Sequence, residues 1–360
     1  MSRFFNPALR RLVPYTPGEQ PLNPRGWIKL NTNESPFPPS PRVLEALRHE
    51  ESEKLRLYSD PECGAFLEAL AGALGVERAQ VFASNGSDEA LAFCFQAFCA
   101  RGAAFPDVTY GFYPVFAGLY GVPKRIVPLR EDFSVAVGDY AGLPHTLFIA
   151  NPNAPTGLAL SLGELEALLA QDPGRLVVVD EAYVDFGAES AVALLPKHGN
   201  LLVVGTFSKS RCLAGARLGF AVGSPALIAD LNTVKFSFNP YNVNRLTLAA
   251  GAAALADPGY FDACVGKIRE NRAAAGAALK ALGFALTDSR ANFLFAQTPR
   301  GLSGPDYCAA LRARDILVRR WDSPRIRDHV RITVGAAGEM DALVAATKEI
   351  LEERGAASRR

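Results

Sequence analysis

Short, unbroken apolar runs recur along the first part of the chain and predict buried strands. Each run leads into a polar stretch, and the runs cover residues 81–82, 146–150, 176–179, 201–204 and 218–222. A run of this length, bounded by turn residues, is typical of a strand covered on both faces. Helical segments separate several runs, among them 90–100 and a helix that the capping box Ser161–Glu164 would open. This alternation predicts an α/β fold, a mostly parallel sheet with helices on both faces.

The chain changes character on either side of this region. Residues 1–40 are rich in proline and asparagine, which excludes a long helix, so we expect an arm crossing a surface. The sequence turns alanine-rich beyond residue 245. Two helices and then two strands are predicted there: 246–256, 261–282, 292–296 and 329–334. The expected parts are an N-terminal arm, a large domain, and a smaller α+β domain that includes part of the arm: 1–40, 41–245 and 246–360.

Composition excludes several classes of function. The net charge is +1 at pH 7, so nothing in the charge balance favours binding to nucleic acid or to an anionic membrane. No apolar run approaches the ~18 residues of a membrane span. The six cysteines form no Cys-x-x-Cys pair and are interpreted as reduced core thiols of a cytoplasmic protein. Four dispersed histidines give no indication of a metal site.

The strand at 201–204 leads into the first candidate for chemistry, the turn Gly205–Lys209. A lysine at a strand end between apolar elements is partly desolvated, which disfavours its charged form. A neutral amine of this kind can attack an aldehyde at neutral pH. Thr206, Ser208 and Arg217 add hydroxyl and guanidinium donors suited to holding a phosphate nearby.

Other polar motifs also follow predicted strands. Asp180 closes an apolar run and would be a costly buried carboxylate without a partner, although it could equally cap the next turn. Ser87 and Asp88 stand at a predicted helix start, which suits either anion binding or simple N-capping. Because open α/β sheets bind ligands beyond the carboxyl ends of their strands, we expect these motifs to converge.

Taken together, these motifs resemble the fold-type-I pyridoxal-phosphate aminotransferases, most specifically the histidinol-phosphate aminotransferase family. The resemblance covers nearly the whole chain through LNTNESPFPPSP, NGSDEAL, NPNAPTG, DEAYVDF, TFSKSRCLAGARLGF, PYNVNRLT and HVRITVG. It implies pyridoxal 5'-phosphate as cofactor, amino transfer from a small-molecule donor to a 2-oxo acid, and a homodimer.

The resemblance also implies a role for individual residues. Lys209 would bind the cofactor covalently, Asp180 would pair with its pyridine nitrogen, and Tyr183 would donate to its phenolic oxygen. Tyr110 would stack on the ring. The residues expected around the phosphate are Ser87, Asp88, Thr206, Ser208, Arg217 and, from the other subunit, Tyr58.

For the substrate, the resemblance implies an anion site made by Arg331 and Arg319, with Tyr15 closing over an imidazole. The favoured reaction is transfer from histidinol phosphate to 2-oxoglutarate, a step of histidine biosynthesis. A decarboxylase acting on threonine phosphate and an aromatic amino-acid aminotransferase stay open as alternatives. A non-catalytic regulator of the same fold usually carries a basic DNA-binding module, and none precedes residue 30.

Three positions depart from the family pattern. Ala154 stands where many relatives have an asparagine that contacts the phenolic oxygen, so either Asn153 or Tyr183 alone is expected to serve there. Ser210-Arg211-Cys212 replaces a small-aromatic-small segment after the lysine, and Val108 replaces a proline. None of the three removes a catalytic group.

Overall fold

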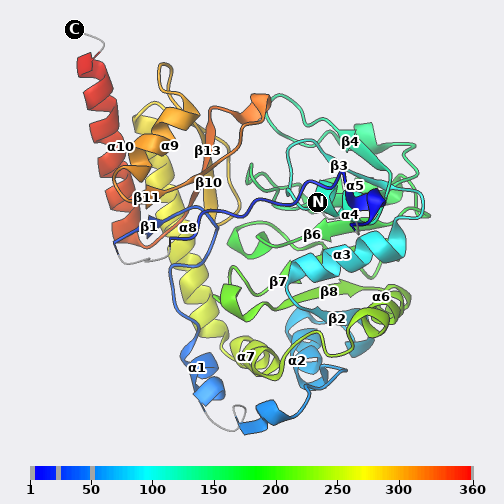
Figure 1. Ribbon diagram of the computed structural model, residues 1–360. Coiled ribbons are helices and arrows are strands. Elements are labelled where there is room, and N and C mark those ends of the chain that lie inside the picture. The colour runs from blue at the N-terminus through cyan, green and yellow to red at the C-terminus, as the bar shows by residue number, and fades with distance from the viewer. Residues whose placement is uncertain (1–4, 22–25, 49–52, 358–360) are drawn as a thin grey trace.

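The computed structural model describes residues 5–21, 26–48 and 53–357, and it divides into two layered bodies (Figure 1). The larger body is built on a seven-stranded sheet and the smaller on a four-stranded sheet. The N-terminal arm runs across both, so that residues from the start of the chain lie beside residues near its end.

The large sheet is mostly parallel, as the sequence predicts. In spatial order its strands are β2 (Val81–Ser84), β8 (Gly219–Gly223), β7 (Leu201–Thr206), β6 (Val177–Asp180), β5 (Thr146–Ala150), β3 (Ala103–Pro106) and β4 (Lys124–Val127). The strands from β7 to β4 pair in parallel, whereas β8 is antiparallel to both of its neighbours. All five predicted apolar runs are strands of this sheet, so these predictions are confirmed.

Burial on both faces explains why the central strands are unbroken apolar runs. Val177 and Val179 of β6 pack into one core while Val178 packs into the other, since successive side chains point to opposite faces. One core also receives side chains from α2 (Gly64–Leu74), α5 (Leu162–Ala170) and α7 (Arg245–Leu255). The opposite core receives them from α3 (Ser87–Phe98), α4 (Tyr113–Leu119) and α6 (Pro225–Phe238).

Helix starts follow the expected chemistry. The Ser161 hydroxyl accepts from the Glu164 backbone N–H and the Glu164 carboxylate accepts from the Ser161 backbone N–H, so the predicted capping box opens α5. Glu164 thereby satisfies a donor that the first turn would otherwise leave free.

The smaller body is an antiparallel sheet covered by long helices. Its strands are β12 (Arg319–Arg320), β13 (His329–Thr333), β10 (Phe293–Gln297) and β9 (Ala285–Leu286). Its helices are α8 (Pro258–Ala281), α9 (Gly304–Arg312) and α10 (Ala337–Ala357). Leu279, Leu311 and Leu343, one from each helix, pack with Ile332 of β13 in a separate core.

The arm ties the two bodies together. Its strand β1 (Ile28–Lys29) pairs in parallel with β11 (Ile316–Leu317), and α1 (Pro41–Arg48) packs against α7. Helix α7 adds Ala250 and Ala254 to a core of the large sheet, although it follows the expected boundary at residue 245. The three-part division of the chain therefore stays a prediction.

The described residues include no helix long and apolar enough to cross a membrane. Within the same residues, no group of three or more histidine, cysteine or acidic side chains could hold a metal ion. All six cysteines are free thiols, and four of them are buried.

Candidate active site

A cavity opens beyond the carboxyl ends of β5, β6 and β7, the edge of the sheet to which the sequence assigns the polar motifs. Of the residues predicted for the site, twelve line this cavity: Tyr15, Ser87, Asp88, Tyr110, Asp180, Tyr183, Thr206, Ser208, Lys209, Arg217, Arg319 and Arg331. Segments from the large sheet, the small sheet and the arm therefore meet here. The convergence follows from the topology, since parallel strands end on the same edge of a sheet.

Lys209 lies three residues beyond the end of β7, half-buried between the large sheet and the arm. Its Nζ donates to the main-chain oxygen of Thr32 at 3.3 Å. Burial and the positive charge of Arg331 lower its pKa from 10.5 to about 8, against the opposing effect of Glu34. A substantial fraction of this amine is therefore neutral near pH 8, which is the state that a nucleophilic lysine needs.

Asp180 is the last residue of β6 and is buried at the cavity wall. Burial raises its pKa to about 6, while the Tyr113 hydroxyl and the Ala182 backbone N–H counteract that rise by donating to the carboxylate. These hydrogen bonds measure 2.9 Å from Tyr113 Oη and 3.2 Å from Ala182 N. The carboxylate is thus mostly ionised above pH 6 and free to receive one more donor from the cavity.

Four residues form a concave, donor-rich corner at the start of α3. Gly86 adopts a left-handed backbone (φ 76°), and a Cβ on it would lie 2.5 Å from Arg217 Nη2. Arg217 Nη1 lies 3.4 Å from the Ser208 hydroxyl, and Ser87 opens the helix. Backbone N–H groups at a helix start together with a guanidinium favour a phosphate.

Tyr183 and Tyr110 both line the cavity, and different hydrogen-bond partners hold their hydroxyl groups. The Tyr183 hydroxyl accepts from Asn33 Nδ2 at 3.0 Å, and the Tyr110 hydroxyl donates to Asp88 Oδ1 at 2.6 Å. Asn33 in turn exchanges two 3.0 Å hydrogen bonds with Thr333 of β13. The arm thereby links a tyrosine of the large body to a strand of the small one.

Two arginines of the small body complete the cavity. Arg331 Nη2 donates to the main-chain oxygen of Asn31 at 3.0 Å, while its Nε is buried and finds no hydrogen-bond partner among the described residues. Arg319 donates to the main-chain oxygens of Thr16 and Pro17 at 2.7 and 3.0 Å. An unsatisfied buried guanidinium nitrogen is costly unless a ligand supplies an acceptor.

Tyr15 extends from the arm over the large body. Its ring stacks on Phe112 with centroids 4.3 Å apart, and 37% of the residue is exposed. The aromatic face at this edge of the cavity can cover a flat ring.

The structure does not bring two predicted residues to the cavity of this chain. The side-chain amide of Asn153 already has three hydrogen bonds outside the cavity. Its Oδ1 accepts from the Thr109 hydroxyl, and its Nδ2 donates to the main-chain oxygen of Val108 and to the Thr156 hydroxyl. Ala154, not Asn153, lines the cavity. Tyr58 stacks on Tyr241 at the surface and is 79% exposed.

Sequence reasoning also missed residues that support the site. Tyr113 and Asn33 anchor Asp180 and Tyr183 respectively, and Thr32 offers a carbonyl to Lys209. Tyr113 is the first residue of α4, and Tyr110 lies in the turn just before it; the Tyr113 backbone N–H donates to the main-chain oxygen of Tyr110 at 3.3 Å. Asn33 has φ 56°, a left-handed backbone conformation that asparagine adopts more readily than most residues. The asparagine at this position is therefore a weak indication, in the sequence, of a turn there.

Comparison with known proteins gives the family. The family model for aminotransferase class I and II matches residues 25–350. Histidinol-phosphate aminotransferase 1 of Bradyrhizobium diazoefficiens is 50% identical over 353 residues, covering 98% of this chain and 100% of that protein. Histidinol-phosphate aminotransferase of Acetobacter pasteurianus is 48% identical over 353 residues, covering 98% and 99% of the two chains.

A solved structure agrees with the sequence matches. The histidinol-phosphate aminotransferase of Sinorhizobium meliloti, in complex with pyridoxal-5'-phosphate, superposes with a TM-score of 0.85 at 26% identity. That match covers 98% of this chain and 99% of the other. Since sequence and structure agree over nearly the full length, the chain belongs to the class I and II aminotransferase family and is a transferase that works with pyridoxal 5'-phosphate.

Proposed function

We propose that this aminotransferase moves the amino group of histidinol phosphate to 2-oxoglutarate. The observation that carries the proposal is the pair Arg319 and Arg331, which line the same cavity as Lys209. Histidinol phosphate has a phosphate where an amino acid has its α-carboxylate, and two guanidiniums offer the forked donors that a dianion prefers. The same pair can receive the carboxylates of the second substrate. The relatives named for this activity support the choice.

The cavity residues fit pyridoxal 5'-phosphate. Asp180 leaves a buried carboxylate facing the cavity, which suits a protonated ring nitrogen. The corner at Gly86, which a Cβ would fill, and the guanidinium of Arg217 suit the phosphate. Lys209 is the amine that would bind the aldehyde, and Tyr183 would donate to the phenolic oxygen. The Tyr110 ring would cover the cofactor ring.

The proposed mechanism assigns the proton movements to this chain's side chains. When bound, the cofactor draws electron density away from the substrate Cα through its protonated ring. Asp180, whose ionised form is favoured by the hydrogen bond from Tyr113, would hold the ring nitrogen protonated. Lys209 would take the proton from the substrate Cα and hold it at Nζ until it is given back. Its pKa of about 8 suits both directions, since general acid–base catalysis works best near the operating pH.

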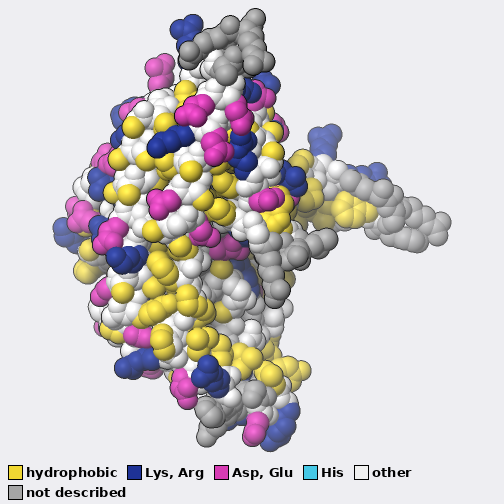
Figure 2. Space-filling view, turned by 90° about the vertical axis from the view of Figure 1, so that its left-hand side faces the viewer, with side chains coloured by type: hydrophobic (Ala, Val, Ile, Leu, Met, Phe, Trp, Pro, Cys, Tyr) yellow, Lys and Arg dark blue, Asp and Glu magenta, His cyan; other side chains and the backbone are white. Residues whose placement is uncertain are grey.

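A homodimer with shared sites is part of the proposal. Tyr58 has no role in the cavity of its own chain, and its exposed ring would reach the phosphate of a partner's cofactor. Figure 2 shows hydrophobic side chains gathered on the lower half of one face. Several large apolar side chains are exposed near Tyr58 in sequence or beside it in space: Leu55, Leu57 and Tyr241. Burial of such a surface would favour association.

A cytoplasmic location, consistent with six free thiols, stays an expectation.

A half-reaction screen tests the substrate. Purified enzyme is mixed with histidinol phosphate, threonine phosphate, phenylalanine or glutamate, and the visible band of the lysine-bound cofactor is followed. We expect the band to disappear fastest with histidinol phosphate, and Arg319→Ala to weaken that reaction selectively. Fastest reaction with phenylalanine, unaffected by Arg319→Ala, would overturn the substrate and keep the aminotransferase. Release of carbon dioxide from threonine phosphate would indicate the decarboxylase instead.

A further inference from the structure

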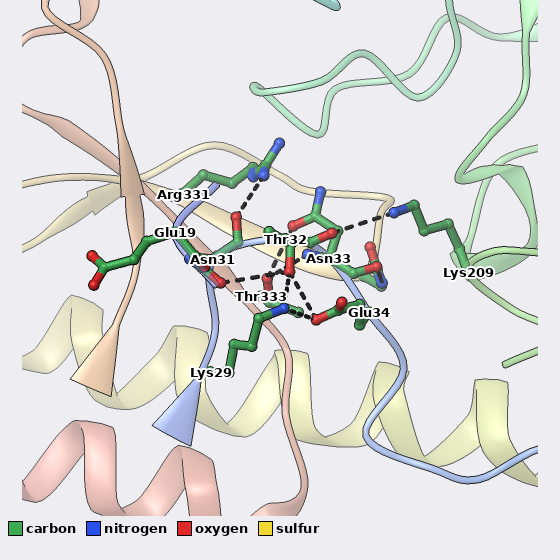
Figure 3. A network of polar contacts seen from close by, with 10 residues as sticks. Glu19, Lys29, Asn31, Thr32, Asn33, Glu34, Lys209, Arg331 and Thr333 are labelled. Carbon is green, nitrogen blue, oxygen red and sulfur yellow. Dashed lines mark hydrogen bonds and ion pairs between the residues drawn. The ribbon is translucent and has the colours of Figure 1, made fainter. Parts of the chain in front are cut away.

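The arm segment Lys29–Glu34 forms a compact polar cluster directly beside Lys209 (Figure 3). Lys29 and Glu34 make an ion pair, and the Thr32 hydroxyl bridges them: it accepts from Lys29 Nζ at 2.5 Å and donates to Glu34 Oε2 at 2.8 Å. Three side chains therefore close a ring within six residues. Such a ring fixes the backbone of the turn that it spans, because each member restrains the others.

The backbone that this ring fixes is the one that contacts Lys209. The main-chain oxygen of Thr32 accepts the hydrogen bond from Lys209 Nζ, and Thr32 lines the cavity. On its other side, Lys29 belongs to β1, which is paired with β11 of the small body. The lysine amine of the large body is thus received by a turn anchored in the small body.

Charged groups of both signs surround the Lys209 amine, and Glu34 is one of the carboxylates that favour its protonated form. Two cations face the amine, Arg331 on β13 and Arg217 beside α3, and they disfavour its protonated form. Two carboxylates act in the opposite sense, Glu34 on the arm and Asp88 on α3. The neighbouring Tyr183 ring lies 5.9 Å from Nζ, and Asp180 is a further anion on β6 that interacts with the amine.

The carboxylates other than Glu34 have other partners in the site. Asp88 accepts from Tyr110 and lies 3.7 Å from Arg217, and Asp180 accepts from Tyr113. Glu34 is the carboxylate that belongs to the same turn as the carbonyl that receives the amine.

We infer that Glu34 is a positioning residue for Lys209: bound to Lys29 and Thr32, it holds the carbonyl that receives the free amine and adds a negative charge near that amine. The amine needs such a place whenever a substrate takes over its bond to the cofactor. A lysine held at one carbonyl stays close to the substrate Cα and does not swing out to solvent. Glu34 acts through Thr32 and by charge at a distance, without touching the reacting atoms.

The inference rests on Lys209 being the reactive lysine of the proposed function, but its test needs no substrate. In the full-length protein freed of cofactor, acetic anhydride labels Lys209 in proportion to its neutral fraction. Peptide mass spectrometry then gives the pH at which labelling is half-maximal. We expect Glu34→Gln to lower this midpoint by about half a pH unit or more, because it removes an anion that favours the ammonium form.

Two further variants make the result specific. Lys29→Met frees Glu34 of its neutralising partner and should move the midpoint in the opposite direction, upward. General damage to the fold would not produce opposite shifts. Glu19→Gln is the matched control: Glu19 lies on the same arm, but its carboxylate pairs with Arg312 at 2.7 Å and points away from Lys209 (Figure 3). Its midpoint should equal that of the parent protein.

The outcomes separate the inference from the proposed function. An unchanged midpoint in Glu34→Gln, the same direction of shift in Lys29→Met, or an equal shift in Glu19→Gln would each overturn the role of Glu34. The substrate screen could still succeed in all these cases. Conversely, the midpoints could shift as expected in an enzyme that prefers phenylalanine.

Discussion

At the residue scale, the carboxylate of Asp180 depends on a tyrosine from outside its own motif. The Tyr113 hydroxyl donates to it at 2.9 Å in a fully buried position, so Tyr113→Phe removes a hydrogen bond to a charged group. Such bonds contribute about 1.5–3 kcal/mol. We expect cofactor affinity at pH 8 to fall about tenfold or more, measured by titrating the cofactor-free protein and following the visible band.

Tyr140 provides the control for that substitution. It is also a fully buried tyrosine, but in the part of the chain that the structure describes its hydroxyl has no hydrogen-bond partner. Tyr140→Phe should leave cofactor affinity unchanged and cost no stability, because it removes an unsatisfied polar group. Equal losses of affinity in both variants would mean that Tyr113 acts by packing alone.

When no cofactor is bound, the ammonium group of Lys209 should lower the free energy of unfolding by a measurable amount. Its pKa in the folded protein, about 8, lies below its ordinary value of 10.5. The folded state therefore disfavours the ammonium, so the destabilisation is fully present below pH 8 and disappears as the pH rises toward 10.5. In cofactor-free protein at pH 7, Lys209→Met should raise the free energy of unfolding by about 2–3 kcal/mol.

Thermal or urea denaturation at pH 7 and pH 10 measures this effect. The advantage of Lys209→Met should shrink at the higher pH, whereas the surface variant Lys197→Met, whose amine pairs with Glu166 at 3.3 Å, should show little difference at either pH. A gain from Lys209→Met that is independent of pH would contradict the lowered pKa and indicate an effect of packing.

At the scale of elements, the junction between β2 and α3 is shaped for a phosphate. Gly86→Ala would place a Cβ 2.5 Å from Arg217 Nη2 at a residue with φ 76°. Both the strain and the displaced guanidinium act on the phosphate corner, so we expect cofactor affinity to fall about a hundredfold, a loss of roughly 3 kcal/mol. Equilibrium dialysis against the cofactor measures this loss.

Gly72 is the matched glycine. It lies inside α2, and a Cβ there would meet no atom of the described residues within 4 Å. Gly72→Ala should leave cofactor affinity intact and stabilise the protein by about 0.5–1 kcal/mol, because alanine loses less conformational entropy in a helix. A hundredfold loss in Gly72→Ala as well would show that the corner at Gly86 is not specific.

The predictability of each element followed from its burial. Strands β5, β6 and β7 are covered on both faces and therefore appear as unbroken apolar runs. Strand β4 lies at the sheet edge with three exposed residues, Lys124, Arg125 and Ile126, so its sequence resembles a polar loop. Strand β3 ends in Pro106, which also weakens the signal.

At the scale of the whole molecule, the site was predictable where one motif supplied the residue. Asp180 ends a strand, and Lys209 and Ser87 lie three residues beyond the ends of theirs, so the common edge of a parallel sheet brings them together. The contacts of Asn33 could not be read this way: its partners Tyr183 and Thr333 lie 150 and 300 residues further along the chain. Such contacts depend on how the arm folds across both bodies, which local patterns do not encode.

The proposed exchange of Tyr58 between subunits is also a property of the whole molecule, and complementation tests it. Under the proposal, each active site takes Lys209 from one chain and Tyr58 from the other. In a mixed dimer of Lys209→Ala and Tyr58→Ala chains, one site therefore contains both substitutions. The other site then has Lys209 from one chain and Tyr58 from its partner, both intact. If chains pair at random, half the dimers are mixed and half of their sites are restored, so activity should return to roughly a quarter of the parent value.

Each variant alone should be far less active, since Lys209→Ala lacks the reactive amine in every site and Tyr58→Ala weakens the hold on the cofactor phosphate in every site. The measurement is the rate of amino transfer after the two proteins are unfolded and refolded together, or expressed from one cell with different tags. If Tyr58 served its own chain, each mixed dimer would contain two defective sites and no activity would return. Tyr58 stacks on Tyr241 and is 79% exposed in the isolated chain, which favours the first outcome, because a large exposed aromatic side chain is available to contact a second copy of the chain.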